Sequence, residues 1–194
     1  MTDTTSATSK RLESHQEYFR RIEAIHVALQ IPSNYRTLRK LTPYIEASDL
    51  VPIEGGEHQL FLAPQAALQW HAMKNAAARD DIQLLLISGF RSVHRQLEII
   101  ERKLRNGTDL NMILAVNAAP GFSQHHTGLA LDIGTPTHPD LIEEFENTEA
   151  FHWLTSYAEK FGFVMPYTRG NPHGFVYEPW HWVLKEVGDL AINL

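Results

Sequence analysis

The 194-residue sequence contains no cysteine. This absence excludes a disulfide framework, catalysis by a thiolate and every metal site that is built on cysteine. The sequence also lacks an excess of basic residues: 17 lysines and arginines stand against 23 acidic residues, for a net charge of -6. This balance argues against a nucleic-acid partner that is bound through its phosphates.

The beginning of the sequence lacks a long apolar run. Residues 1–11 read MTDTTSATSKR, and no apolar stretch of the length of a secretory signal or a membrane anchor follows them. Provided that residue 1 is the native start, this pattern predicts a cytoplasmic protein without a membrane span.

Helical and strand patterns alternate along the chain. Apolar residues recur at helical spacing, or alanine accumulates, in five segments: 9–30, 64–80, 92–105, 109–118 and 148–161. Short apolar runs predict buried strands at 83–87, 129–133 and 180–184. For residues 34–60 we expect a short helix together with irregular chain. Because helices interleave with few strands, we expect an α+β fold, a small antiparallel sheet flanked by helices.

An acidic residue stands inside one of these apolar strands. Alternate side chains of a strand point to opposite faces of the sheet. The side chain of Asp132 is therefore expected on one face, and those of Leu131 and Ile133 on the other. A carboxylate that is buried there needs a cationic partner. His125 precedes the strand in a loop that Gly128 allows to bend back, which brings the imidazole within reach of the carboxylate.

A second histidine belongs to the segment EPWHW, which begins at Glu178. We expect Trp180 and Trp182 on one face of a strand, which leaves His181 on the other face. Pro179 fits neither a helix interior nor a central strand. Glu178 is therefore expected at the entrance of the strand, near His181 but displaced from it.

Two histidines and one aspartate form a ligand set expected for catalytic zinc, which keeps a fourth position for water. The metal lowers the pKa of that water toward about 7, and a nearby carboxylate such as Glu178 can take its proton. In the alternative interpretation, Asp132 belongs to a buried ion pair and His181 is a hydrogen-bonded core histidine. The spacing of the residues leaves both interpretations open.

Three motifs carry a resemblance to a known family. The segment from Ser123 to Asp132 resembles the S-x-H-x-x-G-x-A-x-D signature of the VanY-type D-alanyl-D-alanine carboxypeptidases, zinc peptidases of the hedgehog/DD-peptidase fold. The residues from Glu178 to His181 resemble the E-x-W-H element of that family. Residues 88–96 resemble its S-G-Y-R-S-x-x-x-Q element, with phenylalanine in place of tyrosine. The motifs occur in the family order, and the resemblance covers roughly residues 60–185.

The resemblance implies roles for eight residues. It implies one Zn²⁺ bound by His125, Asp132 and His181, with Glu178 as the catalytic base and with His126 outside the ligand set. It also implies that Arg91 holds the substrate and stabilises the oxyanion, against the alternative of a solvated surface arginine. Further substrate contacts are expected from Gln96, Ser123 and Trp180.

The resemblance also implies a domain division and a substrate. Residues 1–55 are expected to form a helical extension packed on the core, and residues 56–194 the zinc peptidase domain. The expected reaction removes a terminal D-alanine from peptidoglycan stem peptides. A cytoplasmic location favours an L,D-carboxypeptidase that acts on tetrapeptide muropeptides in wall recycling. The alternatives are a D,D-carboxypeptidase that acts on D-Ala-D-Ala ends, a phage-type peptidoglycan endopeptidase, and a zinc-stabilised binding module without catalysis.

Overall fold

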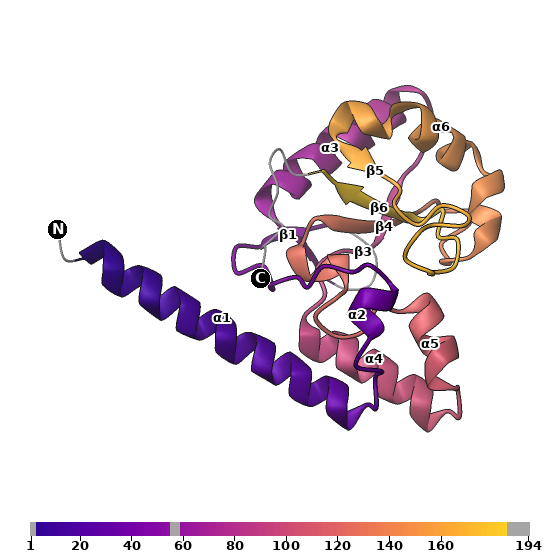
Figure 1. Ribbon diagram of the computed structural model, residues 1–194. Coiled ribbons are helices and arrows are strands. Elements are labelled where there is room, and N and C mark those ends of the chain that lie inside the picture. Colours follow the sequence, from indigo (N-terminus) through magenta and orange to yellow (C-terminus); the bar gives the residue numbers. More distant parts are fainter. Residues whose placement is uncertain (1–2, 55–58, 186–194) are drawn as a thin grey trace.

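The computed structural model describes residues 3–54 and 59–185, with side chains from residue 15 onward (Figure 1). The α-helices are α1 (Asp3–Ala28), α2 (Tyr35–Leu38), α3 (Pro64–Arg79), α4 (Val93–Arg105), α5 (Leu110–Val116) and α6 (Glu149–Tyr157). The 3-10 helices are η1 (Gln124–Thr127), η2 (Glu143–Asn147) and η3 (Ala158–Phe161). The strands are β1 (Val51–Ile53), β2 (Leu60–Leu62), β3 (Leu85–Ser88), β4 (Ala130–Gly134), β5 (Phe163–Val164) and β6 (His181–Leu184).

The strands form two antiparallel sheets. Four strands make the main sheet in the order β3-β4-β6-β5, and β1 pairs with β2 in a separate hairpin. All five residues of β4 are buried, because this strand has a neighbour on each side and is covered on both faces. The prediction of an α+β fold with a small antiparallel sheet is confirmed.

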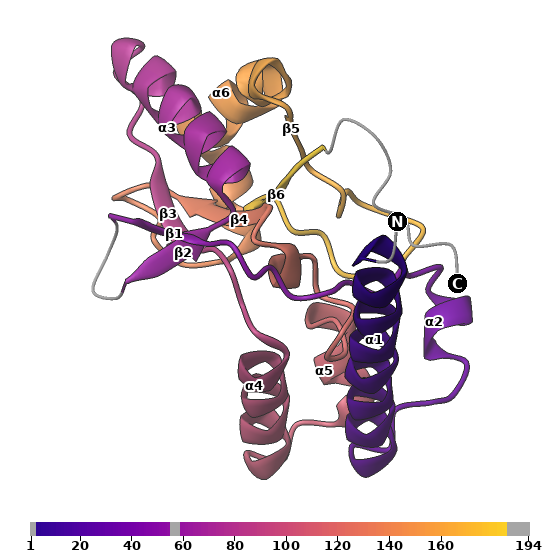
Figure 2. The same cartoon turned by 90° about the vertical axis from the view of Figure 1, so that its left-hand side faces the viewer.

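Helices cover both faces of the main sheet. Figure 2 shows α3 and α6 on one side of it, and α1, α4 and α5 on the other. The first side holds the larger hydrophobic cluster, in which Trp70 and Met73 of α3 meet Leu131 and Ile133 of β4. A second cluster joins α2 and α5 to later loops through Tyr35, Leu114, Phe122 and Phe175.

The element boundaries differ from the sequence prediction in a few places. The predicted helix over 148–161 ends as an α-helix at Tyr157 and continues as the 3-10 helix η3. The last strand starts at His181 rather than at Trp180, which lies in a turn. The expectation that Trp180 and Trp182 share one strand face is therefore wrong. The first helix begins at Asp3, six residues earlier than the predicted segment 9–30.

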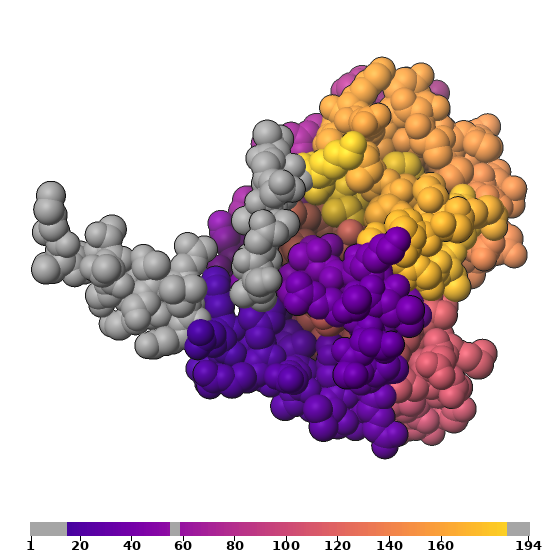
Figure 3. All heavy atoms as spheres, viewed as in Figure 1, coloured from indigo at the N-terminus to yellow at the C-terminus, as the bar shows by residue number. Residues whose placement is uncertain are grey.

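The described part of the N-terminal segment contacts the rest of the chain closely. Ile22 of α1 is buried, and the Tyr18 hydroxyl donates a hydrogen bond to the carbonyl of Tyr44 at 2.9 Å. In the space-filling view, the violet residues near 40 lie against later segments (Figure 3). There the Arg39 guanidinium donates to the carbonyl of Gly174 at 3.2 Å.

The predicted division at residue 55 falls between the two strands of the β1-β2 hairpin, and the division itself stays a prediction. Among the described residues, no helix combines the length and the hydrophobicity needed to cross a bilayer.

Candidate metal centre and active-site cavity

The sheet register brings two predicted ligands together. Asp132 of β4 and His181 of β6 are directly paired across the two strands. His125 comes from η1, the 3-10 helix that precedes β4. Gly128 ends η1 with a φ of +69°, and a Cβ at this position would lie 2.8 Å from the backbone nitrogen of Ala63. A glycine is therefore needed for the loop to bend back over the strand.

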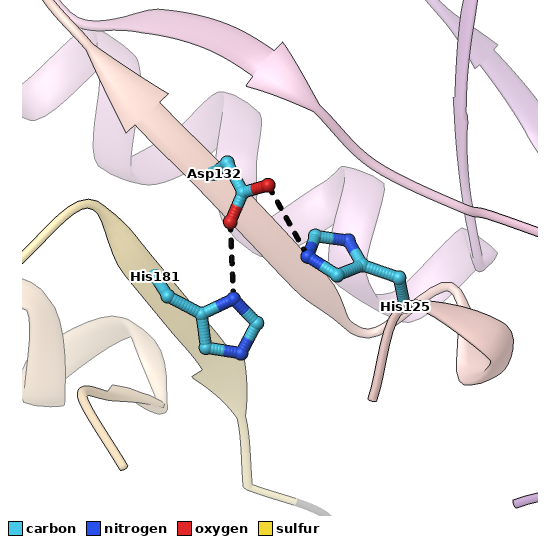
Figure 4. Close-up of side chains that lie close together, drawn as sticks. All are labelled: His125, Asp132 and His181. Carbon is cyan, nitrogen blue, oxygen red and sulfur yellow. Dashed lines mark hydrogen bonds and ion pairs between the residues drawn. The ribbon is translucent and has the colours of Figure 1, made fainter. Parts of the chain in front are cut away.

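The three side chains converge on one point (Figure 4). Asp132 Oδ2 lies 3.3 Å from His125 Nε2, and Asp132 Oδ1 lies 3.0 Å from His181 Nδ1. One ligand atom from each residue lies within 4.8 Å of the other two, and all three residues are buried. This spacing and donor set fit one divalent cation with a position left for solvent.

Charge and burial make these groups ready to bind a cation. Burial alone would raise the pKa of Asp132, but the imidazoles of His125 and His181 hold this pKa well below its usual value. The carboxylate is therefore ionised. Burial lowers the pKa of His125 against the opposing effect of Asp132, which favours the neutral imidazole with a lone pair for a metal. A carboxylate and a neutral imidazole are the forms in which Asp132 and His125 would bind a metal.

The orientation of the His125 ring is set by the backbone. His125 Nδ1 lies 2.6 Å from the carbonyl oxygen of Gly89, just after β3. Because a carbonyl only accepts, Nδ1 carries the proton and Nε2 is left for a metal. Gly89 must come close to β2 for this contact, since a Cβ there would lie 2.5 Å from the carbonyl oxygen of Phe61.

The neighbouring His126 points away from the metal centre. Its Nδ1 lies 2.6 Å from the carbonyl oxygen of Arg91, and its Nε2 accepts a hydrogen bond from the backbone N–H of Gly121 at 3.0 Å. Burial lowers the pKa of His126 to about 4, which keeps the ring neutral. His126 therefore connects two loops, in agreement with its predicted place outside the ligand set.

Glu178 lies in the same cavity as the predicted ligands. Its backbone N–H donates to the carbonyl of Tyr167 at 3.0 Å, and its own carbonyl accepts from the N–H of His181 at 3.1 Å. These bonds place the carboxylate beside the ligand set without including it. Burial raises the pKa of Glu178 from 4.5 to about 7, against a smaller opposing effect of His181. A carboxylate with this pKa exchanges protons near neutral pH.

Arg91 is not a solvated surface residue. Its Nη1 donates to Gln96 Oε1 at 3.1 Å, and its Nη2 donates to Ser88 Oγ at 3.1 Å. Nη2 also lies 3.5 Å from Asp132 Oδ2, and the guanidinium lines the cavity. The surface alternative is therefore wrong. Arg91 is a fixed cation beside the candidate metal centre.

The three further predicted substrate contacts all line the cavity. Ser123 is buried and makes no capping hydrogen bond to η1 with its side chain. Gln96 is fully buried, and its amide is engaged at both ends, by Arg91 and by the carbonyl of Ala118 at 2.7 Å. Trp180 forms part of the cavity wall. Their roles toward a substrate stay predictions.

The cavity measures about 350 Å³, and several of its lining residues were not predicted from the sequence, among them Lys103, Gln124 and Tyr167. Tyr167 stacks on the ring of His181 at 4.8 Å, and Gln124 Oε1 lies 2.9 Å from His181 Nε2. Lys103 donates a hydrogen bond to Asn117 inside the cavity. Gln124 stands between Ser123 and His125 in the signature, which was the one signal that pointed to it. Lys103 and Tyr167 lie outside all three motifs.

Known proteins resemble this chain over most of its length. The chain is 31% identical to the putative carboxypeptidase YodJ of Bacillus subtilis (strain 168) over 167 residues, which are 84% of this chain and 59% of that protein. The LdcB LD-carboxypeptidase structure superimposes with a TM-score of 0.64 at 30% identity, covering 72% of this chain and 69% of that one.

A mutant of the vancomycin-resistance D,D-pentapeptidase VanY, solved in complex with Zn(II), shares the fold. The TM-score is 0.58 at 24% identity, covering 76% of this chain and 87% of that one. The sequence profile of the VanY family, described as D-alanyl-D-alanine carboxypeptidase, matches residues 59–186, which contain the whole candidate site. The chain belongs to the VanY D-alanyl-D-alanine carboxypeptidase family.

Proposed function

We propose that this protein is a zinc carboxypeptidase that releases the terminal D-alanine of peptidoglycan stem peptides. The observation that carries the proposal is the convergence of His125, Asp132 and His181 beside Glu178 in one cavity of a VanY-family chain. A zinc-stabilised binding module would need the three ligands but not a buried carboxylate beside them. Glu178 therefore favours the enzyme over the module.

The residues divide the work of amide hydrolysis among them. His125, Asp132 and His181 would hold Zn²⁺, which supplies a Lewis acid and an acidified water molecule when bound. Glu178 accepts the proton of the attacking water and delivers it to the amine that leaves. Its raised pKa suits both steps, because a group with a pKa near the working pH is populated in the protonated and in the ionised form.

Arg91 meets the negative charge that develops on the scissile carbonyl oxygen. Hydrogen bonds to Ser88 and Gln96 fix its guanidinium before a substrate arrives, so little reorganisation is needed during the reaction. A preorganised donor of this kind stabilises a transition state by roughly 3–4 kcal/mol.

Within this activity, we favour cleavage of tetrapeptides by an L,D-carboxypeptidase. The 30% identity and the shared fold with the LdcB LD-carboxypeptidase support this choice. The likeness to the D,D-pentapeptidase VanY, at 24% identity, supports the fold alone. A role in wall recycling further requires that the enzyme meets these peptides in the cytoplasm. Fractionation of cells that express the tagged full chain tests this location.

Digestion of purified muropeptides tests the proposal. The zinc-loaded protein should release D-alanine from tetrapeptides, and a His125→Ala variant, which lacks one ligand, should release none. Release from pentapeptides alone would instead assign a D,D-carboxypeptidase. Cleavage of cross-linked stem peptides without release of free D-alanine would assign an endopeptidase. Failure on all of these substrates by a protein that binds zinc would refute the peptidase.

A further inference from the structure

The second ring nitrogen of His181 has a partner of its own. While His181 Nδ1 faces Asp132 at 3.0 Å, its Nε2 lies 2.9 Å from the amide oxygen of Gln124 on η1. The ring is also stacked against Tyr167 and is 3% exposed, so it has little room to turn. The imidazole is therefore held at both nitrogens and on one face.

A neutral imidazole presents a lone pair on only one of its nitrogens. An acceptor at one nitrogen keeps the proton there and frees the other nitrogen for a metal. The carbonyl of Gly89 has this effect on His125, where it leaves Nε2 free. Gln124 stands in the corresponding position at His181, where its oxygen keeps the proton on Nε2 and leaves Nδ1 free. The two ligands thus offer different ring atoms, and each is oriented by its own acceptor.

The N-terminal segment surrounds the loop that carries Gln124. The backbone N–H of Tyr44 donates to the carbonyl of Gly121 at 2.8 Å, and the N–H of Ala47 donates to the carbonyl of His126 at 2.8 Å. These two bonds bracket Gln124 in the sequence. The side chain of Tyr44 lies beside that of Gln124. A hydrogen bond between these two side chains lowers the pKa of Tyr44, against the larger rise that burial causes. The chain before β1 thus supports the residue that orients His181.

We propose that Gln124 is a positioning residue of the metal centre, which fixes His181 with Nδ1 directed at the metal. We propose further that the segment around Tyr44 holds Gln124 in place. The inference rests on the proposed zinc site, and it gives the N-terminal segment, which carries none of the family motifs, a part in that site.

Zinc affinity in the full chain tests the role of Gln124, with Zn²⁺ titrated against a competing chelator. Gln124→Met removes the acceptor at similar volume and should weaken zinc binding by about 10–100-fold. Gln124→Glu keeps an oxygen acceptor and should bind zinc within about threefold of the unmodified protein. Gln65→Met makes the same change at an exposed position of α3 and should leave the affinity unchanged.

Equal affinity of Gln124→Met and the unmodified protein would overturn the proposal. If the unmodified protein binds no zinc, the proposed function fails together with the inference. If zinc binds normally in Gln124→Met, only the inference fails. Tyr44→Phe removes one hydroxyl and should weaken zinc binding by about three- to tenfold. An unchanged affinity there would overturn the part assigned to the N-terminal segment.

A second measurement uses the unmodified protein and therefore does not depend on the folding of a variant. Ring nitrogen chemical shifts of ¹⁵N-labelled, zinc-loaded protein report which nitrogen of His181 is coordinated and which carries the proton. We expect coordination through Nδ1 and a protonated, hydrogen-bonded Nε2. Coordination through Nε2 would overturn the proposal directly.

Discussion

Replacing Glu178 with glutamine should inactivate the enzyme and at the same time stabilise its metal-free fold. Glu178 lines the cavity and is 9% exposed, and burial raises the pKa of its carboxyl group to about 7. Glutamine has nearly the same shape but accepts no proton. The exchange therefore removes the function of the group and the cost of burying its charge.

The loss of activity follows from the role of a general base. Proton transfer by a positioned side chain contributes about 10²–10⁴-fold to a rate. We therefore expect kcat to fall by a factor in this range, while zinc binding is retained because Glu178 is outside the ligand set. The three ligand residues are unchanged in this variant.

The gain in stability follows from the pKa. In the unfolded chain the carboxyl titrates near 4.5, whereas in the fold it titrates near 7. The folded state binds the proton more tightly, so this group lowers stability as the pH rises from about 4.5 through 7. The full loss above pH 7 corresponds to about 3 kcal/mol. Glutamine does not ionise, so the variant escapes this loss.

Thermal unfolding of the metal-free proteins between pH 4 and pH 8.5 measures the effect. The difference in melting temperature between Glu178→Gln and the unmodified protein should be near zero at pH 4 and should reach roughly 6–12 °C above pH 7. Glu144→Gln, at an exposed position, should show no such rise. A difference that does not grow with pH would refute the argument from burial. Unimpaired turnover in Glu178→Gln would refute the assignment of the base.

Three further substitutions probe other parts of the structure. Arg91→Lys replaces a guanidinium that is fixed by two hydrogen bonds, and it should lower kcat by about 10²–10³-fold with zinc content unchanged. Gly89→Ala places a Cβ 2.5 Å from the carbonyl oxygen of Phe61, and thermal or urea unfolding should show a destabilisation of about 1–3 kcal/mol. Burial lowers the pKa of His26 below 6.5, so protonation favours the unfolded state and stability falls as the pH drops below 6.5. His26→Gln, compared by thermal unfolding at pH 7.5 and pH 5.5, should lose less stability over this range than the unmodified protein.

The sequence predicted the elements whose cause is local. Helix α3 follows from Pro64 at its first turn and from the alanine-rich stretch behind it. The alternation around Asp132 also held, since Leu131 and Ile133 enter the hydrophobic cluster while the carboxylate faces the other side. The start of β6 was misplaced at Trp180, which lies in a turn even though its carbonyl accepts a hydrogen bond from the N–H of Ile133 in β4. Pairing with β4 across the sheet decides this boundary.

By itself, the sequence determined which residue types can hold a metal and which family motifs they form, because spacing and residue identity are sequence properties. Only the tertiary structure decided that strand pairing sets Asp132 opposite His181, that burial raises the pKa of Glu178, and that Gln124 lies against His181. These contacts join segments up to 57 positions apart in the chain. Their geometry depends on how the sheet and its loops pack, which no local pattern encodes.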